Sequence, residues 1–181
     1  SLASFVERYR DKEAIPAVGS AVVMDVNTGA VLACATYPSY DLNTYYQNYE
    51  ALSKDKSSPL WNRALMSTYE PGSTMKPAIA VAGLEEGVIT ETSRFYCTHI
   101  YRQFTDTTFK CLGSHGWIDV KNALNQSCNI YFYETGRLLG INRMNDYCTR
   151  FGLGQKTGVE INESSGVLAG IAYREAHGGT W

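Results

Sequence analysis

The sequence has little charge of either sign and no long apolar segment. Its 16 basic and 18 acidic side chains give a formal net charge of −2. This balance excludes the basic surface of a nucleic-acid-binding protein, so no nucleic-acid partner is expected. The longest apolar run, residues 78–84, is far shorter than the roughly 20 residues that a membrane-spanning helix needs. No signal peptide is recognisable at the start, so if the parent protein is anchored or exported, those parts are expected outside this soluble piece.

Proline and cysteine are sparse, with five of each. The cysteines are odd in number and form no C-x-x-C pair, so their count does not decide the redox compartment. Cys34 and Cys148 lie in apolar stretches, which predicts buried thiols. The 44% of hydrophobic and 19% of charged residues exclude a disordered tail or a coiled coil. The 181 residues suffice for one ordinary domain, or for one domain with a small lobe.

The pattern of apolar residues predicts an α+β (or α/β) fold, in which a cluster of helices packs on an antiparallel sheet. We expect a hairpin over residues 19–36, whose near-continuous apolar strands predict a sheet covered on both faces. Further expected elements are a short helix over 3–12, a loop over 37–62 with at most one short helix, and a helix over 76–86. A polar-aromatic hairpin or excursion is expected over 94–118, followed by two helical segments between 120 and 139, a helix over 141–151, and a glycine-rich loop to the end.

The sharpest local feature is a serine and a lysine one helical turn apart. Pro71-Gly72 forms a turn, and an apolar helix follows. Pro77 has no N–H group and is tolerated only in a first helical turn, so the helix is predicted to begin close to Ser73. Lys76 then lies on the same face as Ser73. A helix start favours an oxyanion, and a partly desolvated lysine can activate a serine nucleophile.

A second polar feature, Ser127-Cys128-Asn129, interrupts an amphipathic helical pattern. Read alone, it indicates a loop between two helices with Ser127 and Asn129 as capping residues. Together, Ser-x-x-Lys at a helix start and Ser-x-Asn some fifty residues later resemble the penicillin-recognising serine acyltransferases.

The flanking sequence is similar to the class B penicillin-binding proteins, of the elongation or sporulation type. The similarity rests on segments 19–25 and 28–33, on the P-S-Y-D-x-N segment at 38–43, and on short matches at 115–116, 123–124, 151–154 and 157–158. It extends from about residue 19 to residue 181. It implies a lead-in segment over 1–18 and a partial transpeptidase domain over 19–181.

The resemblance implies a role for each residue of the two motifs. Ser73 would attack the D-Ala-D-Ala carbonyl of a peptidoglycan stem peptide, with Lys76 as general base. Ser127 would relay the proton to the leaving amine, and Asn129 would hold the donor peptide and contact Lys76. No cofactor is required by this chemistry. β-Lactams would trap Ser73 as a stable acyl-enzyme.

One family motif is missing from its expected place. The family carries K-[ST]-G on a strand that faces the nucleophile, whereas Lys156-Thr157-Gly158 follows a helix and comes too soon after Ser127. We interpret this match as a chance one, and expect the true motif and the remaining strands beyond residue 181.

The resemblance also implies a place and partners for the parent protein. It would be anchored at the extracytoplasmic face of the bacterial membrane and would work with a cell-wall glycosyltransferase complex. Two alternatives stay open: a D,D-carboxypeptidase or β-lactamase of the same superfamily, and a β-lactam sensor or non-catalytic binding module. No E-x-x-L-N segment follows Ser127, which argues against the β-lactamase.

Three residues of the polar-aromatic stretch, Cys97, Cys111 and His115, have the spacing C-x13-C-x3-H. Thiolates and imidazole are zinc ligands, and Cys97 and Cys111 could equally form a disulfide across a hairpin. A structural zinc site, a disulfide and free thiols all stay open, because no fourth zinc ligand is evident.

Overall fold

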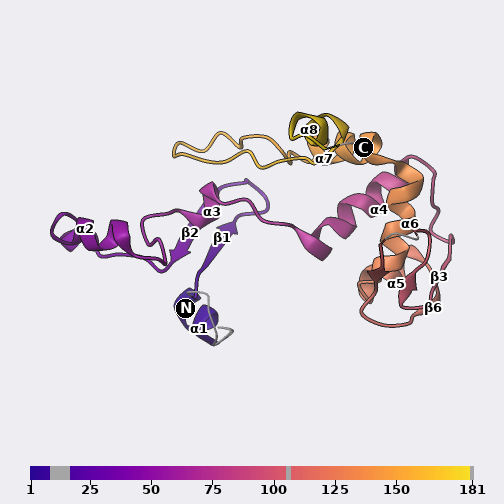
Figure 1. The fold of residues 1–181 in the computed structure, drawn as a ribbon, viewed down its shortest axis with the longest axis horizontal. Coiled ribbons are helices and arrows are strands. Elements are labelled where there is room, and N and C mark those ends of the chain that lie inside the picture. Colours follow the sequence, from indigo (N-terminus) through magenta and orange to yellow (C-terminus); the bar gives the residue numbers. More distant parts are fainter. Residues whose placement is uncertain (9–16, 105–106, 180–181) are drawn as a thin grey trace. The chain divides into compact units, whose positions relative to one another are not determined.

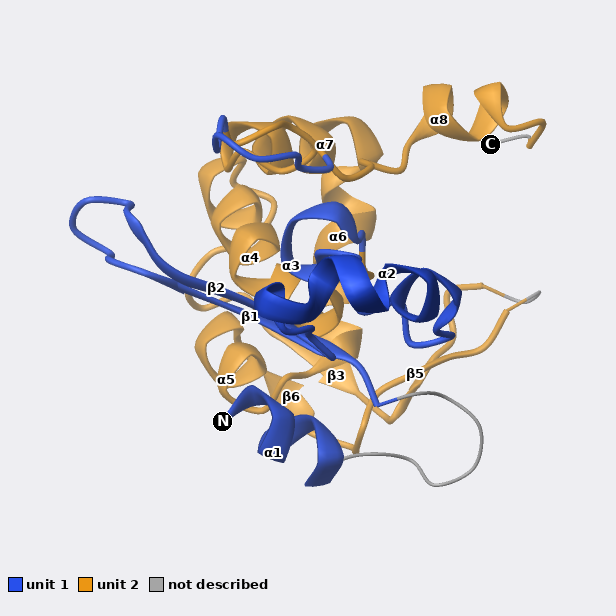
Figure 2. Cartoon of the chain, turned by 90° about the vertical axis from the view of Figure 1, so that its left-hand side faces the viewer, with its two compact units in different colours: residues 1–68, 158–164 blue, residues 69–157, 165–181 orange. Residues whose placement is uncertain are grey.

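A computed structural model describes residues 1–8, 17–104 and 107–179. The chain divides into two compact units, shown in blue and orange in Figure 2. Unit 1 comprises residues 1–68 and 158–164, and unit 2 comprises residues 69–157 and 165–181. The described elements follow one another as labelled in Figure 1. None of the helices in these ranges is long and apolar enough to cross a membrane.

Unit 1 is built around one antiparallel hairpin, as the sequence predicts. Strands β1 (Gly19–Met24) and β2 (Val31–Tyr37) pair in register from Gly19 opposite Tyr37. The turn between them closes at Gly29, whose φ of 74° is one that glycine adopts without strain. The remaining elements are α1 (Leu2–Arg8), the 3₁₀ turn η1 (Leu42–Thr44), α2 (Tyr45–Lys54) and α3 (Arg63–Met66). The predicted first helix is confirmed over residues 3–8, and residues 9–12 of that prediction lie outside the described residues.

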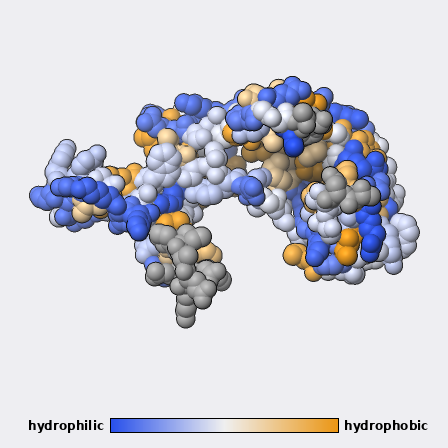
Figure 3. Space-filling view, viewed as in Figure 1, coloured by the Kyte–Doolittle hydropathy of each residue, from blue (hydrophilic) through white to orange (hydrophobic). Residues whose placement is uncertain are grey.

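The prediction that both faces of this hairpin are covered is wrong for the described chain. Val23, Met24 and Leu32 are each more than half exposed. A sheet of two strands has few neighbouring side chains to bury its apolar residues. Cys34 of β2 is exposed for the same reason, contrary to its prediction as a buried thiol. Figure 3 shows hydrophobic residues at the surface among hydrophilic ones.

Unit 2 carries the main hydrophobic core, formed where two helices pack closely. Helix α4 (Lys76–Glu85) contacts α6 (Asn129–Leu139), and α7 (Ile141–Arg150) packs on both. Gly83 permits the close approach, because a Cβ atom there would lie 2.8 Å from the Cγ2 atom of Thr135. The most buried members of this core are Ala82, Ile89, Cys97, Ala123, Cys128, Tyr131 and Leu139.

Short strands complete unit 2 and confirm the predicted polar-aromatic hairpin. Strand β3 (Phe95–Cys97) pairs with β6 (Gly116–Ile118), and β4 (Ile100–Tyr101) pairs with β5 (Phe109–Lys110). Residues 105–106, at the predicted turn, lie outside the described residues. Helix α5 (Val120–Asn125) precedes α6.

Helix α8 (Ile171–Ala176) lies where a loop is predicted, because Gly170 and the residues after Ala176 bound a short helical stretch. Helices with small antiparallel sheets confirm the α+β class. The division at residue 18 stays a prediction.

Candidate active site

Ser73 lies in a 3₁₀ turn that leads directly into helix α4. The turn η2 (Gly72–Met75) begins after Pro71, and α4 begins at Lys76 with Pro77 in its first turn. The Lys76 N–H group donates to the Ser73 carbonyl, which links the turn to the helix. Ser73 is exposed and Lys76 is buried. One turn separates them, and Lys76 Nζ lies 3.1 Å from Ser73 Oγ.

Ser127 ends helix α5 in a left-handed conformation, with a φ of 52°. Its N–H group donates to the Leu124 carbonyl, and the Cys128 N–H group donates to the Ala123 carbonyl. This pair of hydrogen bonds is the Schellman arrangement, in which a glycine usually takes the left-handed position. A serine held there is uncommon, and such strain gathers at functional sites. The turn leaves both the carbonyl and the hydroxyl of Ser127 within reach of Lys76.

Asn129 begins helix α6 and is held at both ends of its side-chain amide. Its Nδ2 atom donates to the Lys110 carbonyl of β5 over 3.0 Å. Its Oδ1 atom accepts from Lys76 Nζ over 2.7 Å. The strand β5 therefore fixes which end of the amide faces the lysine.

Lys76 Nζ is the centre of the site (distances 2.7 Å to Ser127 O, 2.9 Å to Ser127 Oγ and 2.7 Å to Asn129 Oδ1). The Ser127 hydroxyl also donates to Ser73 Oγ over 3.0 Å. Two of these partners, a carbonyl and an amide oxygen, can only accept. A neutral amine has two N–H groups for them and one lone pair left for a serine hydroxyl. Burial lowers the pKa of Lys76, against the opposing effect of Cys111 and Cys128, and so favours this neutral form.

A second cluster, the thiol–imidazole cluster, adjoins these residues: Cys97, Cys111, His115 and Cys128. Their ligand atoms all lie within 4.8 Å of one another. His115 Nδ1 lies 3.4 Å from Cys97 Sγ and 3.5 Å from Cys111 Sγ, and the sulfurs of Cys111 and Cys128 lie 3.9 Å apart. Zn–S bonds of about 2.3 Å at tetrahedral angles place two sulfurs about 3.8 Å apart, so the donor set fits zinc. All five cysteines are free thiols.

Sequence reasoning missed Cys128 as the fourth member of this cluster. It lies inside the Ser127-Cys128-Asn129 motif, which was interpreted through its two polar residues, Ser127 and Asn129. Burial raises the pKa of Cys111, but backbone N–H groups of Gly113, Asn129 and Ile130 outweigh it and lower that pKa to about 7. Burial raises the pKa of Cys128. A metal ion would favour both as thiolates.

The segment Lys156-Thr157-Gly158 lies in an exposed loop, with no strand assigned to it. Gly154 and Gly158 both have positive φ values, as expected for a chain that turns repeatedly. The interpretation of this match as a chance one is therefore consistent with the structure.

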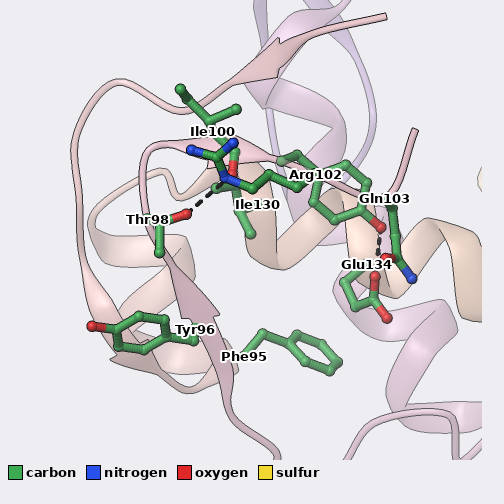
Figure 4. Close-up of a pocket in the computed structure, with 9 residues that line it drawn as sticks. Phe95, Tyr96, Thr98, Ile100, Arg102, Gln103, Ile130 and Glu134 are labelled. Atoms are coloured by element: carbon green, nitrogen blue, oxygen red, sulfur yellow. Dashed lines mark hydrogen bonds between the residues drawn. The ribbon is translucent and has the colours of Figure 1, made fainter. Parts of the chain in front are cut away.

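A cavity of about 310 Å³ opens on β3, β4 and α6 (Figure 4), and none of the four motif residues lines it. Ile100 and Ile130 form part of its wall, and Arg102 and Gln103 lie at its edge. The Tyr101 hydroxyl donates to Glu134, which also binds Arg137. The carboxylate of Glu134 therefore accepts hydrogen bonds from two side chains of the protein itself.

Solved structures of known proteins share this fold. Penicillin-binding protein PBP2 of Pseudomonas aeruginosa, in complex with WCK 5153, matches with a TM-score of 0.84 and 33% identity, over 99% of this chain and 42% of that chain. PBP2 of Helicobacter pylori, in complex with MreC, matches with a TM-score of 0.83 and 27% identity, over 90% of this chain and 32% of that chain.

Curated relatives agree with the structural matches. Peptidoglycan D,D-transpeptidase MrdA of Salmonella typhimurium (strain SL1344) is 35% identical over 173 residues, which are 88% of this chain and 27% of the relative. Peptidoglycan D,D-transpeptidase FtsI of Escherichia coli (strain K12) is 32% identical over 150 residues, which are 82% of this chain and 24% of the relative. The chain thus spans about a quarter of the length of these relatives.

The family model described as "Penicillin binding protein transpeptidase domain" matches residues 19–171. This range includes both motifs and the whole thiol–imidazole cluster. The resemblance to class B penicillin-binding proteins is confirmed by the MrdA and FtsI relatives. The chain belongs to the penicillin-binding protein transpeptidase domain family.

Proposed function

We propose that the protein containing this chain is a serine D,D-transpeptidase that cross-links peptidoglycan. One observation carries the proposal: a single buried amine, Lys76 Nζ, contacts Ser73, Ser127 and Asn129 at once. A nucleophile, a base and a proton relay joined through one atom form the arrangement that acyl transfer requires.

Acylation begins at Ser73. Lys76 takes the hydroxyl proton while Ser73 Oγ forms a bond to the carbonyl carbon of the penultimate D-Ala. The Ser127 hydroxyl, in contact with both Lys76 and Ser73, gives its proton to the nitrogen of the terminal D-Ala and takes the proton held by Lys76, and the C–N bond breaks. An amine of a second stem peptide then attacks the acyl-enzyme and releases Ser73. The N–H group of Ser73 at the helix start is one donor to the oxyanion.

The substrate, inhibitors and location follow from the family as proposals. The donor is a stem peptide ending in D-Ala-D-Ala, and β-lactams acylate the same serine. The relatives act on peptidoglycan by name, and one PBP2 structure contains MreC, which supports a place in cell-wall machinery with a glycosyltransferase. We place the site at the extracytoplasmic face of the membrane.

Labelling with a fluorescent penicillin tests this proposal in the full-length gene product. Ser73 should carry the label, and Ser73→Ala should abolish it, while Ser53→Ala, which alters an exposed serine of α2, should label normally. Retained labelling of Ser73→Ala would refute the nucleophile. Cross-linked product from stem-peptide substrates identifies a transpeptidase, hydrolysis without cross-linking identifies a carboxypeptidase or β-lactamase, and a stable label without turnover on peptides identifies a sensor.

We further propose that the thiol–imidazole cluster binds one structural zinc ion. Its three sulfurs and one imidazole nitrogen suit a closed tetrahedral site, and their spacing matches zinc bond lengths. Zinc would tie strand β3 and the β5–β6 connection to the start of α6. Purified protein should hold about one equivalent of zinc and melt several degrees lower after chelation. Cys97→Ser should lose the metal and Cys34→Ser should retain it. Equal zinc content in these two variants would contradict the site.

A further inference from the structure

Two thiols of the cluster are bonded into the active-site loop itself. Cys128 stands between Ser127 and Asn129 in the sequence, so a backbone shift at Cys128 acts on both neighbours. Cys111 Sγ accepts the backbone N–H group of Asn129 over 3.2 Å. The two sulfurs lie 3.9 Å apart, which is a contact between thiols and about 1.9 Å longer than a disulfide bond.

We propose that Cys111 and Cys128 are a redox modification site, at which a small hydroperoxide forms a disulfide that switches off acylation of Ser73. The effect on acylation rests on the function proposed above, whereas the oxidation itself does not. The oxidant is assigned as small because Cys111 is 3% exposed and Cys128 is fully buried. A protein oxidoreductase could not bring its own disulfide to either sulfur in the folded chain.

The oxidation takes place in two steps, and each one conserves atoms and electrons. The Cys111 thiolate attacks one peroxide oxygen, the O–O bond breaks, and with one proton taken up Cys111 becomes a sulfenic acid while water or an alcohol leaves. Cys128 sulfur then attacks Cys111 sulfur, the S–S bond forms, the S–O bond breaks, and water leaves with the thiol proton. The two sulfurs lose two electrons in all, and the peroxide gains them.

The order of attack follows from the surroundings of each sulfur. Cys111 is the one with residual exposure, and the Asn129 N–H group stabilises its thiolate. Cys128 is enclosed but adjacent, which suits it to resolve a sulfenic acid on Cys111. Cys97 Sγ also belongs to the cluster, where it donates to the Gly113 carbonyl and contacts His115 Nδ1, but Cys111 and Cys128 are the two sulfurs whose contact adjoins the Asn129 N–H group.

Closing the disulfide disturbs the catalytic hydrogen bonds directly. The sulfurs must approach by about 1.9 Å, and the Asn129 N–H group loses its thiolate acceptor. Lys76 contacts Ser127 Oγ over 2.9 Å and Asn129 Oδ1 over 2.7 Å, and these contacts tolerate little displacement. A misplacement of about 1 Å can cost about 100-fold in rate, so we expect acylation to slow at least about tenfold.

The experiment uses the full-length gene product with Cys34→Ser, which removes the exposed thiol of β2. Protein is treated with hydrogen peroxide, quenched and alkylated, and the cross-linked peptides are mapped by mass spectrometry. Zinc release is followed with a chromogenic chelator. The rate of labelling by a fluorescent penicillin is measured before oxidation, after it, and after dithiothreitol. Circular dichroism checks that each variant is folded.

A mapped Cys111–Cys128 disulfide, slower labelling and recovery with dithiothreitol are expected. In the Cys97→Ser variant, peroxide should slow penicillin labelling, and dithiothreitol should restore the rate. In the Cys128→Ser variant, no such reversible slowing of labelling is expected. A cross-link through Cys97, or sulfinic acid without a cross-link, would overturn the assigned pair. A Cys111–Cys128 disulfide with an unchanged labelling rate would overturn the switch. If reduced protein is never labelled, the proposed function fails, and the peptide map alone still decides whether this pair is oxidised.

Discussion

Lys76 Nζ and Asn129 Oδ1 lie 2.7 Å apart, although 53 positions separate the two residues in the chain. The contact joins the first turn of α4 to the first residue of α6, and the close packing of these helices at Gly83 maintains it. Because the amine is buried at this junction, its protonation is governed by the protein rather than by solvent.

Acylation should therefore depend on pH through Lys76. Burial lowers the pKa of this amine below its usual 10.5, so the neutral base is present at lower pH than in an exposed lysine. The rate of penicillin acylation should rise with pH to a plateau, with a midpoint below 10.5. Lys76→Arg, which stays charged, should lose at least about 100-fold and show no such rise. A flat profile in the unaltered protein would contradict a lysine base.

Asn129→Ala should slow acylation while leaving the protein folded. The change removes the oxygen that accepts from Lys76 and the amide that binds Lys110. Lys76 becomes charged when it takes the Ser73 proton, and a hydrogen bond to a charged group contributes about 1.5–3 kcal/mol, so a loss of about 10–100-fold in the acylation rate is expected. Asn122→Ala, at the exposed start of α5, is the matched control for loss of an amide. Equal rates in the two variants would remove Asn129 from the site.

Two substitutions of Ser127 should separate conformation from chemistry. Glycine relieves the left-handed backbone and alanine does not, so Ser127→Gly should be more stable than Ser127→Ala by about 1 kcal/mol. Both lack the hydroxyl that contacts Ser73 and should acylate slowly. Denaturant titration gives the first comparison and penicillin labelling the second. Full activity in Ser127→Gly would show that the hydroxyl is dispensable.

Glu134 should contribute stability that acid removes. Hydrogen bonds from Arg137 and Tyr101, against opposing burial, lower the pKa of this carboxyl below 4.5. A lowered folded-state pKa adds stability above the unfolded-state pKa, and this is lost as pH falls through the folded-state pKa. The melting temperature of Glu134→Gln should lie below that of the unaltered protein at neutral pH, and the gap should close on acidification. Glu50→Gln removes an ion pair whose side chains are 72% and 84% exposed and should change little. A gap for Glu134→Gln that persisted in acid would contradict this assignment.

Local sequence signals predicted the parts of the fold that depend on neighbours in the chain. Pro71, Gly72 and Pro77 together placed the start of α4, and Gly29 and Gly87 marked a turn and a helix end. The spacing of Ser73 and Lys76 follows from one helical turn, so their contact could be expected from the sequence alone.

Features that depend on contacts between distant segments of the chain could not be predicted in this way. The exposure of β1 and β2 depends on which other elements cover them, and apolar composition does not reveal that. Cys128 meets Cys97 and Cys111 only because β3, β5 and α6 come together. The sequence does not indicate the left-handed φ of Ser127 either, since glycine is the usual residue at that position.

The burial of Lys76 has a consequence for how the protein is made. A ribosome synthesises α4 well before the residues that satisfy its amine, since Ser127 and Asn129 follow 51 and 53 positions later. Until they emerge, enclosing Lys76 would leave its nitrogen with Ser73 Oγ but without the acceptors of Ser127 and Asn129, which is costly. The first turn of α4 must therefore stay open to water during translation. The nascent chain can form the turn that carries Ser73 early, but it can enclose Lys76 only after the start of α6 has been made.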